Sequence, residues 1–78
     1  MKMFKKIRVN RWLFKWMTRA LVAMERATTA EERNSAYKGA QLGVEITLMD
    51  YPELENYVNH LWETIYRPAF EVKMAENG

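Results

Sequence analysis

The sequence predicts an all-α fold, a small domain of three helices that is expected to self-associate. Three observations predict it: apolar residues recur at helical spacing in three segments, capping residues precede two of these segments, and no pair of strands is evident. The expected architecture is a long basic N-terminal helix at residues 4–26, two shorter helices at 30–49 and 51–66, and a short C-terminal tail at 67–78. At 78 residues, the chain 1–78 is expected to be a single domain.

The first helix is expected to be basic on one side and apolar on the other. At about 100° per residue, one narrow stripe holds the cations Arg8, Arg11, Lys15, Arg19 and Arg26. The opposite side is broad enough to face two neighbours and holds Ile7, Leu13, Phe14, Met17, Ala20, Leu21 and Met24. Trp12 and Trp16, one turn apart, line the border. The helix would be about 35 Å long, more than a small bundle needs, so its first turns are expected to protrude or fray.

The second helix is expected to begin with a capping box. Thr29 and Glu32 have the spacing at which each side chain accepts a hydrogen bond from the other residue's backbone N–H. The apolar stripe that follows is Ala36, Tyr37, Ala40, Val44 and Leu48. A strand is the alternative for residues 44–49, because apolar and polar residues alternate in "VEITLM". Helix is favoured because no partner strand is evident elsewhere.

The third helix also carries start and stop signals. Asp50 is expected to be its N-cap, with Pro52 in the first turn and Glu53 at the capping-box position. Its apolar positions are Leu54, Tyr57, Val58, Leu61 and Ile65, with Trp62 and Tyr66 beside them. Pro68 is expected to end or kink the helix. The residues after it would form an extended tail or a short extra helix.

Composition limits what such a chain can be. Hydrophobic residues make up 49% of it, with three Trp, four Tyr and three Phe, which is more apolar surface than so small a domain easily covers. A homo-oligomer is therefore expected. The absence of Cys fits a reducing compartment, so a cytoplasmic location is expected. Three early lysines resemble the start of a signal peptide, but Arg11, Lys15 and Arg19 interrupt the following segment too often for a leader or a membrane span.

Charge is divided unevenly along the chain. Residues 1–26 carry eight cations against one acid, a balance of +7, whereas residues 27–78 carry four cations against nine acids, a balance of −5. Two interpretations follow. Either the first part binds an acidic ligand, or the basic helix packs on the acidic remainder of its own or a neighbouring chain.

The basic stripe and its flanking tryptophans form the candidate partner-binding site. Its residues are Arg8, Arg11, Trp12, Lys15, Trp16 and Arg19. An acidic protein surface is the first expected partner, because aromatic and Arg side chains are favoured interface anchors. Nucleic acid is the second, with cations on phosphates and indoles stacking on bases. A membrane surface is the third. The structural alternative is a solvated cationic face whose Trp residues belong to the core.

Ser35, Gly39 and Gly43 form a stripe of small residues at four-residue spacing in the second helix. Because a glycine inside a helix costs about 1 kcal/mol, the stripe indicates that another backbone comes close there. We expect it to be a self-association seam. The alternative is that two helices of the same chain pack there.

No catalytic, cofactor-binding or metal-binding site is expected. The stretch "ELENYVNHLWE" holds the candidate ligands Glu53, Glu55, His60 and Glu63. A di-iron bundle would need a second such set, and the chain has one His, so His60 is interpreted as a boundary residue. Phosphate-binding glycine loops and nucleophile constellations are missing from the sequence. The expected function is therefore non-enzymatic: a small regulator or inhibitor of another macromolecule, of the accessory kind found on phages and plasmids.

Overall fold

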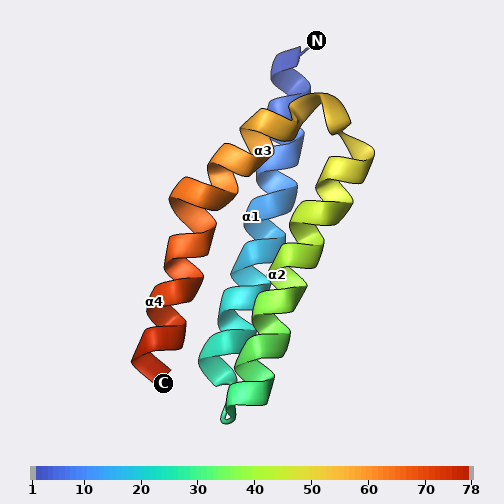
Figure 1. Ribbon diagram of the computed structural model, residues 1–78. Coiled ribbons are helices and arrows are strands. Elements are labelled where there is room, and N and C mark those ends of the chain that lie inside the picture. The colour runs from blue at the N-terminus through green and yellow to red at the C-terminus, as the bar shows by residue number, and fades with distance from the viewer. Residues whose placement is uncertain (1, 78) are drawn as a thin grey trace.

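A computed structural model of the chain has three helical arms side by side, each antiparallel to the arm before it in the chain (Figure 1). It describes the backbone of residues 2–77 and the side chains of residues 4–76. The elements are, in chain order, α1 (Lys2–Arg26), α2 (Ala30–Asp50), the 3₁₀ turn η1 (Pro52–Leu54), α3 (Glu55–Leu61), the π-helical turn η2 (Trp62–Tyr66) and α4 (Arg67–Asn77). The last four, from η1 to α4, are continuous and form the third arm. Residues 2–77 contain no strand, so the all-α three-helix prediction is confirmed, as is the helical interpretation of 44–49.

The turn between α1 and α2 is built by the predicted capping box. The Thr29 hydroxyl accepts a hydrogen bond from the Glu32 backbone N–H at 3.1 Å, and the Glu32 carboxylate accepts one from the Thr29 backbone N–H at 3.2 Å. Thr28 adds two more bonds to the same carboxylate oxygen, from its backbone N–H and from its hydroxyl. These bonds satisfy backbone N–H groups that have no partner within the helix, so α2 begins at a fixed residue.

The start of the third arm differs from the prediction. Asp50 is the last residue of α2 and does not cap the next helix, because the cap position of η1 is Tyr51, which makes no side-chain capping bond. Pro52 does occupy the first turn, as predicted. The Tyr51 backbone N–H donates to the Thr47 carbonyl at 2.8 Å, and the Leu54 N–H donates to the Tyr51 carbonyl at 3.0 Å. This corner therefore rests on backbone hydrogen bonds.

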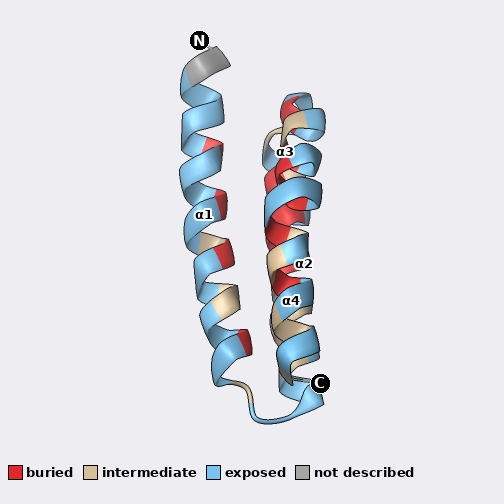
Figure 2. Ribbon diagram, turned by 90° about the vertical axis from the view of Figure 1, so that its left-hand side faces the viewer, coloured by how far each residue is buried: buried red, intermediate tan, exposed pale blue. Residues whose placement is uncertain are grey.

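The core side of α1 is rotated relative to the prediction. Its buried residues are Val9, Leu13, Met17 and Met24, and they lie along the side that faces the other helices (Figure 2). Ile7 and Phe14, predicted as core, are 49% and 61% exposed. The physical reason is that the apolar arc of α1 is wider than its neighbours can cover. The rotation that buries Val9 brings the tryptophan edge of the helix against α2 and leaves Ile7 and Phe14 outside.

The extended C-terminal tail is wrong, and the helical alternative for these residues is found, because residues 67–77 form α4 and continue the third helix; residue 78 lies outside the described part. Core residues recur here at strict four-residue spacing: Val58, Trp62, Tyr66 and Phe70. In a regular α-helix each step of four residues rotates the side chain by about 40° around the helix axis, so later members of the row would point away from the core. The wider turn of η2, in which the Arg67 backbone N–H donates to the Trp62 carbonyl, turns the row back. Pro68 follows directly, where the hydrogen-bond ladder is already displaced.

The third arm packs through an aromatic cluster. The rings of Tyr37, Trp62 and Phe70 lie 5.9–6.1 Å apart between centroids and join α2 to the third arm. Leu61 is buried, as predicted, whereas Ile65, also predicted on the apolar stripe, is exposed. Burial raises the pKa of the Tyr66 hydroxyl above its ordinary value. The core therefore lies between the three arms. The molecule as a whole has principal extents of 43 × 18 × 15 Å.

Candidate functional site

Both tryptophans of the candidate site are used inside the chain. The Trp12 indole N–H donates to the Thr47 hydroxyl at 2.8 Å, and the Trp16 indole N–H donates to the Gly39 carbonyl at 2.7 Å. Thr47 is buried and donates in turn to the Gly43 carbonyl at 2.7 Å. Indoles held in this way tie α1 to α2, and their N–H groups are already used within the chain.

The small-residue stripe of α2 is divided between two environments. Gly43 is buried directly against the Trp16 ring, which is the intramolecular packing that was the alternative for this stripe. Gly39 has open space where a side chain would be, and Ser35 is exposed. A seam between two copies through all three residues is therefore not available while Trp16 covers Gly43. Self-association as such stays a prediction.

The cations of α1 do face solvent. Exposed positions hold Arg8, Arg11, Lys15, Arg19 and Arg26. Within the residues that the structure describes, none of these five forms an ion pair. The acidic remainder of the chain therefore does not neutralise this stripe, and five charges stay available to an external partner.

The first turns of α1 are attached to the start of the third arm. Lys5 donates to the Glu53 carboxylate at 3.0 Å, and this bond lowers the pKa of that carboxyl group. Lys6 lies over the Tyr57 ring, 5.3 Å from its centroid, and the Asn10 amide donates to the Tyr57 hydroxyl at 3.2 Å. These contacts hold turns that the sequence had led us to expect as protruding or frayed. Lys5 and Lys6, two cations outside the stripe, thus have partners within the chain.

An apolar row next to the cations was missed by sequence reasoning. Phe4, Ile7, Phe14 and Val22 are all exposed on the outer face of α1. Arg8 and Arg11 lie among them and share with Phe4 and Ile7 a shallow hollow of about 230 Å³. We call these four apolar residues, together with Arg8, Arg11, Lys15 and Arg19, the outer face of α1. Ile7 and Phe14 adjoin the core arc in helical spacing and were therefore predicted as core, whereas Phe4 and Val22 fall at the angular position of the cations.

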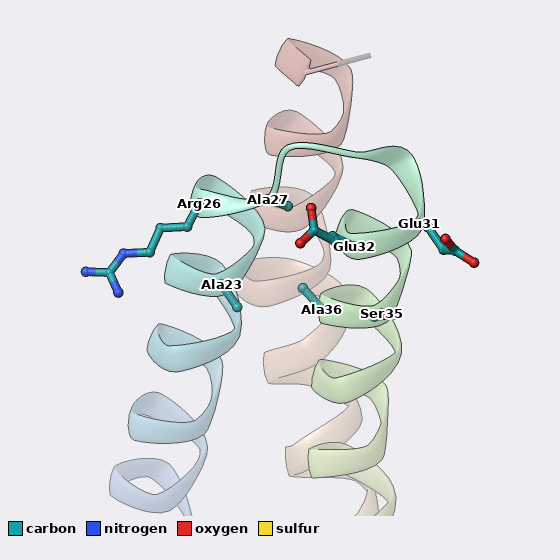
Figure 3. A pocket seen from close by; sticks show the side chains of 7 residues that line it. All are labelled: Ala23, Arg26, Ala27, Glu31, Glu32, Ser35 and Ala36. Atoms are coloured by element: carbon teal, nitrogen blue, oxygen red, sulfur yellow. The ribbon is translucent and has the colours of Figure 1, made fainter.

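A hollow of about 640 Å³ lies at the turn between α1 and α2 (Figure 3). It is lined by Ala23, Arg26, Ala27, Glu31, Glu32, Ser35 and Ala36. In the figure the Arg26 and Glu31 side chains point away from the hollow on opposite sides. Glu32 has a lowered pKa, caused first by the backbone N–H of Thr28, and this serves the capping box. With small lining residues and its one perturbed group used by the cap, the hollow has no evident chemistry.

The carboxylates of the third arm do not assemble a ligand site. Glu53 binds Lys5, Glu63 pairs with Arg67, and His60 is exposed. Across the described residues, no group of three His, Asp or Glu side chains is placed to hold a metal ion. Along the same stretch, the Thr64 hydroxyl donates to the His60 carbonyl at 2.7 Å, next to the π-helical turn.

Comparisons with protein families, with curated proteins and with solved structures found no match. Between residues 2 and 77, no helix is both long enough and apolar enough to cross a membrane. The outer face of α1 combines exposed aromatic and aliphatic side chains with cations that form no ion pair within the described residues, and the opposite side of the helix is packed on α2.

Proposed function

We propose that this protein is a non-enzymatic regulator that binds an acidic protein through the outer face of α1. The observation that carries the proposal is the mixture on that face: Phe4, Ile7 and Phe14 exposed next to Arg8 and Arg11, with no ion pair to the rest of the described chain. Aromatic and Arg side chains contribute most where protein interfaces are strongest. The matching surface is a groove with an apolar floor and carboxylates along its edge.

The internal use of the indoles favours a protein over nucleic acid. Trp12 and Trp16 donate their N–H groups to α2, so these groups are not free to donate to bases or phosphates. A complex made through phosphate contacts would also leave Phe4 and Phe14 facing water. Nucleic acid remains the second candidate because the five unpaired cations from Arg8 to Arg26 span about 27 Å of helix, enough to follow several phosphates.

The small size of the chain favours a regulatory or inhibitory role. A 9.3 kDa chain with an exposed binding helix can occupy a partner's surface. The proposal includes a cytoplasmic location, self-association, and an accessory role of the kind found on phages and plasmids.

A capture experiment with matched variants tests the proposal. The tagged parent chain is incubated with host lysate at two salt concentrations, with and without nuclease. Arg11→Gln/Lys15→Gln/Arg19→Gln removes charge, Phe14→Gln removes apolar surface, and Val72→Gln is the control because Val72 is a similarly exposed residue on α4. Nuclease-resistant capture of one protein that is lost with both α1 variants and kept by the control is the expected result.

The alternatives give different results. Nuclease-sensitive capture with a steep salt dependence, lost with the charge variant but kept by Phe14→Gln, would replace the protein partner by nucleic acid. Capture that is indifferent to both α1 variants would overturn the assignment of this surface.

A further inference from the structure

A second apolar surface lies at the seam between α1 and α2. Leu42, Ile46 and Met49 share one side of α2 by helical spacing, and Ile46 is the member of this set that borders α1. Leu42 is 49% exposed and Met49 80% exposed, and Ile46 shares a hollow of about 280 Å³ with the exposed Trp12 of α1. We call Trp12, Leu42, Ile46 and Met49 the seam surface. The parts of these side chains that face water contribute no burial energy to the fold.

The seam surface carries charge of both signs. The hollow beside Trp12 is lined by Arg8 from α1 and by Asp50 from the end of α2. Neither side chain takes part in an ion pair within the described residues. A two-fold symmetric interface brings the same patch from each copy together, so a patch that holds both an unpaired cation and an unpaired anion is complementary to itself. A purely acidic or purely basic partner would leave one of the two charges opposed.

The chain also exposes more surface than is expected for a monomer of its mass. A 9.3 kDa monomer is expected to expose about 5,000 Å², whereas this chain exposes 5655 Å². The excess, roughly 700 Å², is close to the area that each partner buries in a standard-sized interface, about 800 Å². The excess is thus of the size that one interface with a second copy would cover.

We propose that two copies of this chain associate through their seam surfaces about a two-fold axis. Trp12, Leu42, Ile46 and Met49 of one copy pack on the same residues of the other, and Arg8 of each copy meets Asp50 of its partner. The α1–α2 pairs then form a four-helix layer, an arrangement in which helical hairpins commonly bury a shared apolar seam. The seam surface shares Arg8 with the outer face of α1 but contains none of its apolar residues. The dimer specifies the self-association included in the proposed function, and binding of the acidic partner is tested separately through Phe14, Arg11, Lys15 and Arg19.

Sedimentation equilibrium of the purified full chain tests the dimer. At about 100 µM, where weak specific contacts are populated, the parent is expected to have twice the 9.3 kDa mass. Leu42→Glu and Met49→Glu are each expected to raise the dimer dissociation constant at least tenfold. Val72→Glu, at a residue 56% exposed on α4, is the control and should leave it unchanged. Circular dichroism checks that each variant is folded, and Met49 is exposed enough that its variant keeps the helices even if Leu42→Glu does not.

A charge-swap mixture tests the paired contact. Arg8→Asp alone and Asp50→Arg alone should each weaken the dimer, because each places like charges across the interface twice. An equimolar mixture of the two variants should dimerise as the parent does, because every contact in the mixed pair then joins opposite charges.

Four outcomes would overturn the proposal. They are a parent that is monomeric at 100 µM, a dimer that both seam variants leave intact, a dimer that Val72→Glu or Phe14→Gln breaks while the seam variants do not, and a mixture of the charge variants that fails to restore association.

Discussion

Trp16 of α1 lies directly over Gly43 of α2, at a position where the structure leaves no room for a methyl group. The ring is fixed there because its N–H donates to the Gly39 carbonyl one turn away. A helical glycine weakens α2 by itself, so its use here has a physical reason: it lets a large aromatic ring lie against the helix backbone. The two glycines of α2 thus have opposite surroundings, one covered and one open.

This contrast predicts opposite effects of the same substitution. Gly43→Ala should lower the free energy of unfolding by about 1–2 kcal/mol, because displacing the Trp16 ring costs more than the helix gains. Gly39→Ala should raise it by up to about 1 kcal/mol, because nothing lies near the added methyl group. Urea denaturation followed by circular dichroism measures both. A stabilised Gly43→Ala protein would show that Trp16 is not held where the structure has it.

Leu61 and His60 are neighbours on α3 with opposite environments, and their replacements form a matched pair. Leu61→Ala should cost about 2–5 kcal/mol, enough to unfold most of so small a domain, because Leu61 belongs to the buried core. His60→Ala should be nearly silent in stability and in partner capture, since the side chain is exposed. Thermal unfolding gives the first comparison and the capture assay the second. Loss of capture by a folded His60→Ala protein would revive the metal-binding or proton-exchange interpretation of this residue.

The capping box gives α2 a predictable response to acid. The backbone N–H and then the hydroxyl of Thr28 donate to the Glu32 carboxylate and lower its pKa below the ordinary 4.5. In the unfolded chain Glu32 takes up its proton at higher pH than in the folded protein. The stabilisation is therefore fully present above about pH 4.5 and is lost as the pH falls through the lowered value.

Glu32→Gln should remove this part of the acid sensitivity, and thermal midpoints between pH 7 and pH 3 would measure it. Glu31→Gln is the control, because Glu31 carries the same charge in the same turn and, in the described part of the chain, makes no capping bond. Equal acid responses of the two variants would contradict the role given to the Glu32 carboxylate.

The cationic stripe should matter for binding and not for folding. Arg11→Gln/Lys15→Gln/Arg19→Gln should leave the thermal midpoint nearly unchanged, because exposed charges without partners contribute little to stability. The same variant should bind the captured partner at least tenfold more weakly, about 1.4 kcal/mol, because complementary charge governs encounter and register. Titration calorimetry with that partner gives the affinity. Unchanged affinity would make the stripe a solvated surface only, and an unfolded variant would show that these cations hold the acidic remainder of the chain.

Local signals in the sequence determined the helices and the turn between the first two. The Thr29–Glu32 box acts over four neighbouring residues, so its geometry follows from spacing alone. The periodicity of α2 and of the first part of the third arm is likewise local, and it placed Leu61 and Val58 in the core. The exposed cations of α1 were found because Lys and Arg rarely leave solvent without a partner.

Only the tertiary structure decided which side of α1 is core, where the third arm ends, and what the tryptophans do. The apolar arc of α1 is wider than one neighbouring helix can cover, so α1 could pack in more than one rotation about its axis. The hydrogen bonds of Trp12 to Thr47 and of Trp16 to Gly39, between residues far apart in the chain, selected the rotation. Likewise Pro68 forbids a regular ladder, yet burying Phe70 behind a π-helical turn outweighs that local preference. These choices depend on contacts between segments, which helical spacing does not encode.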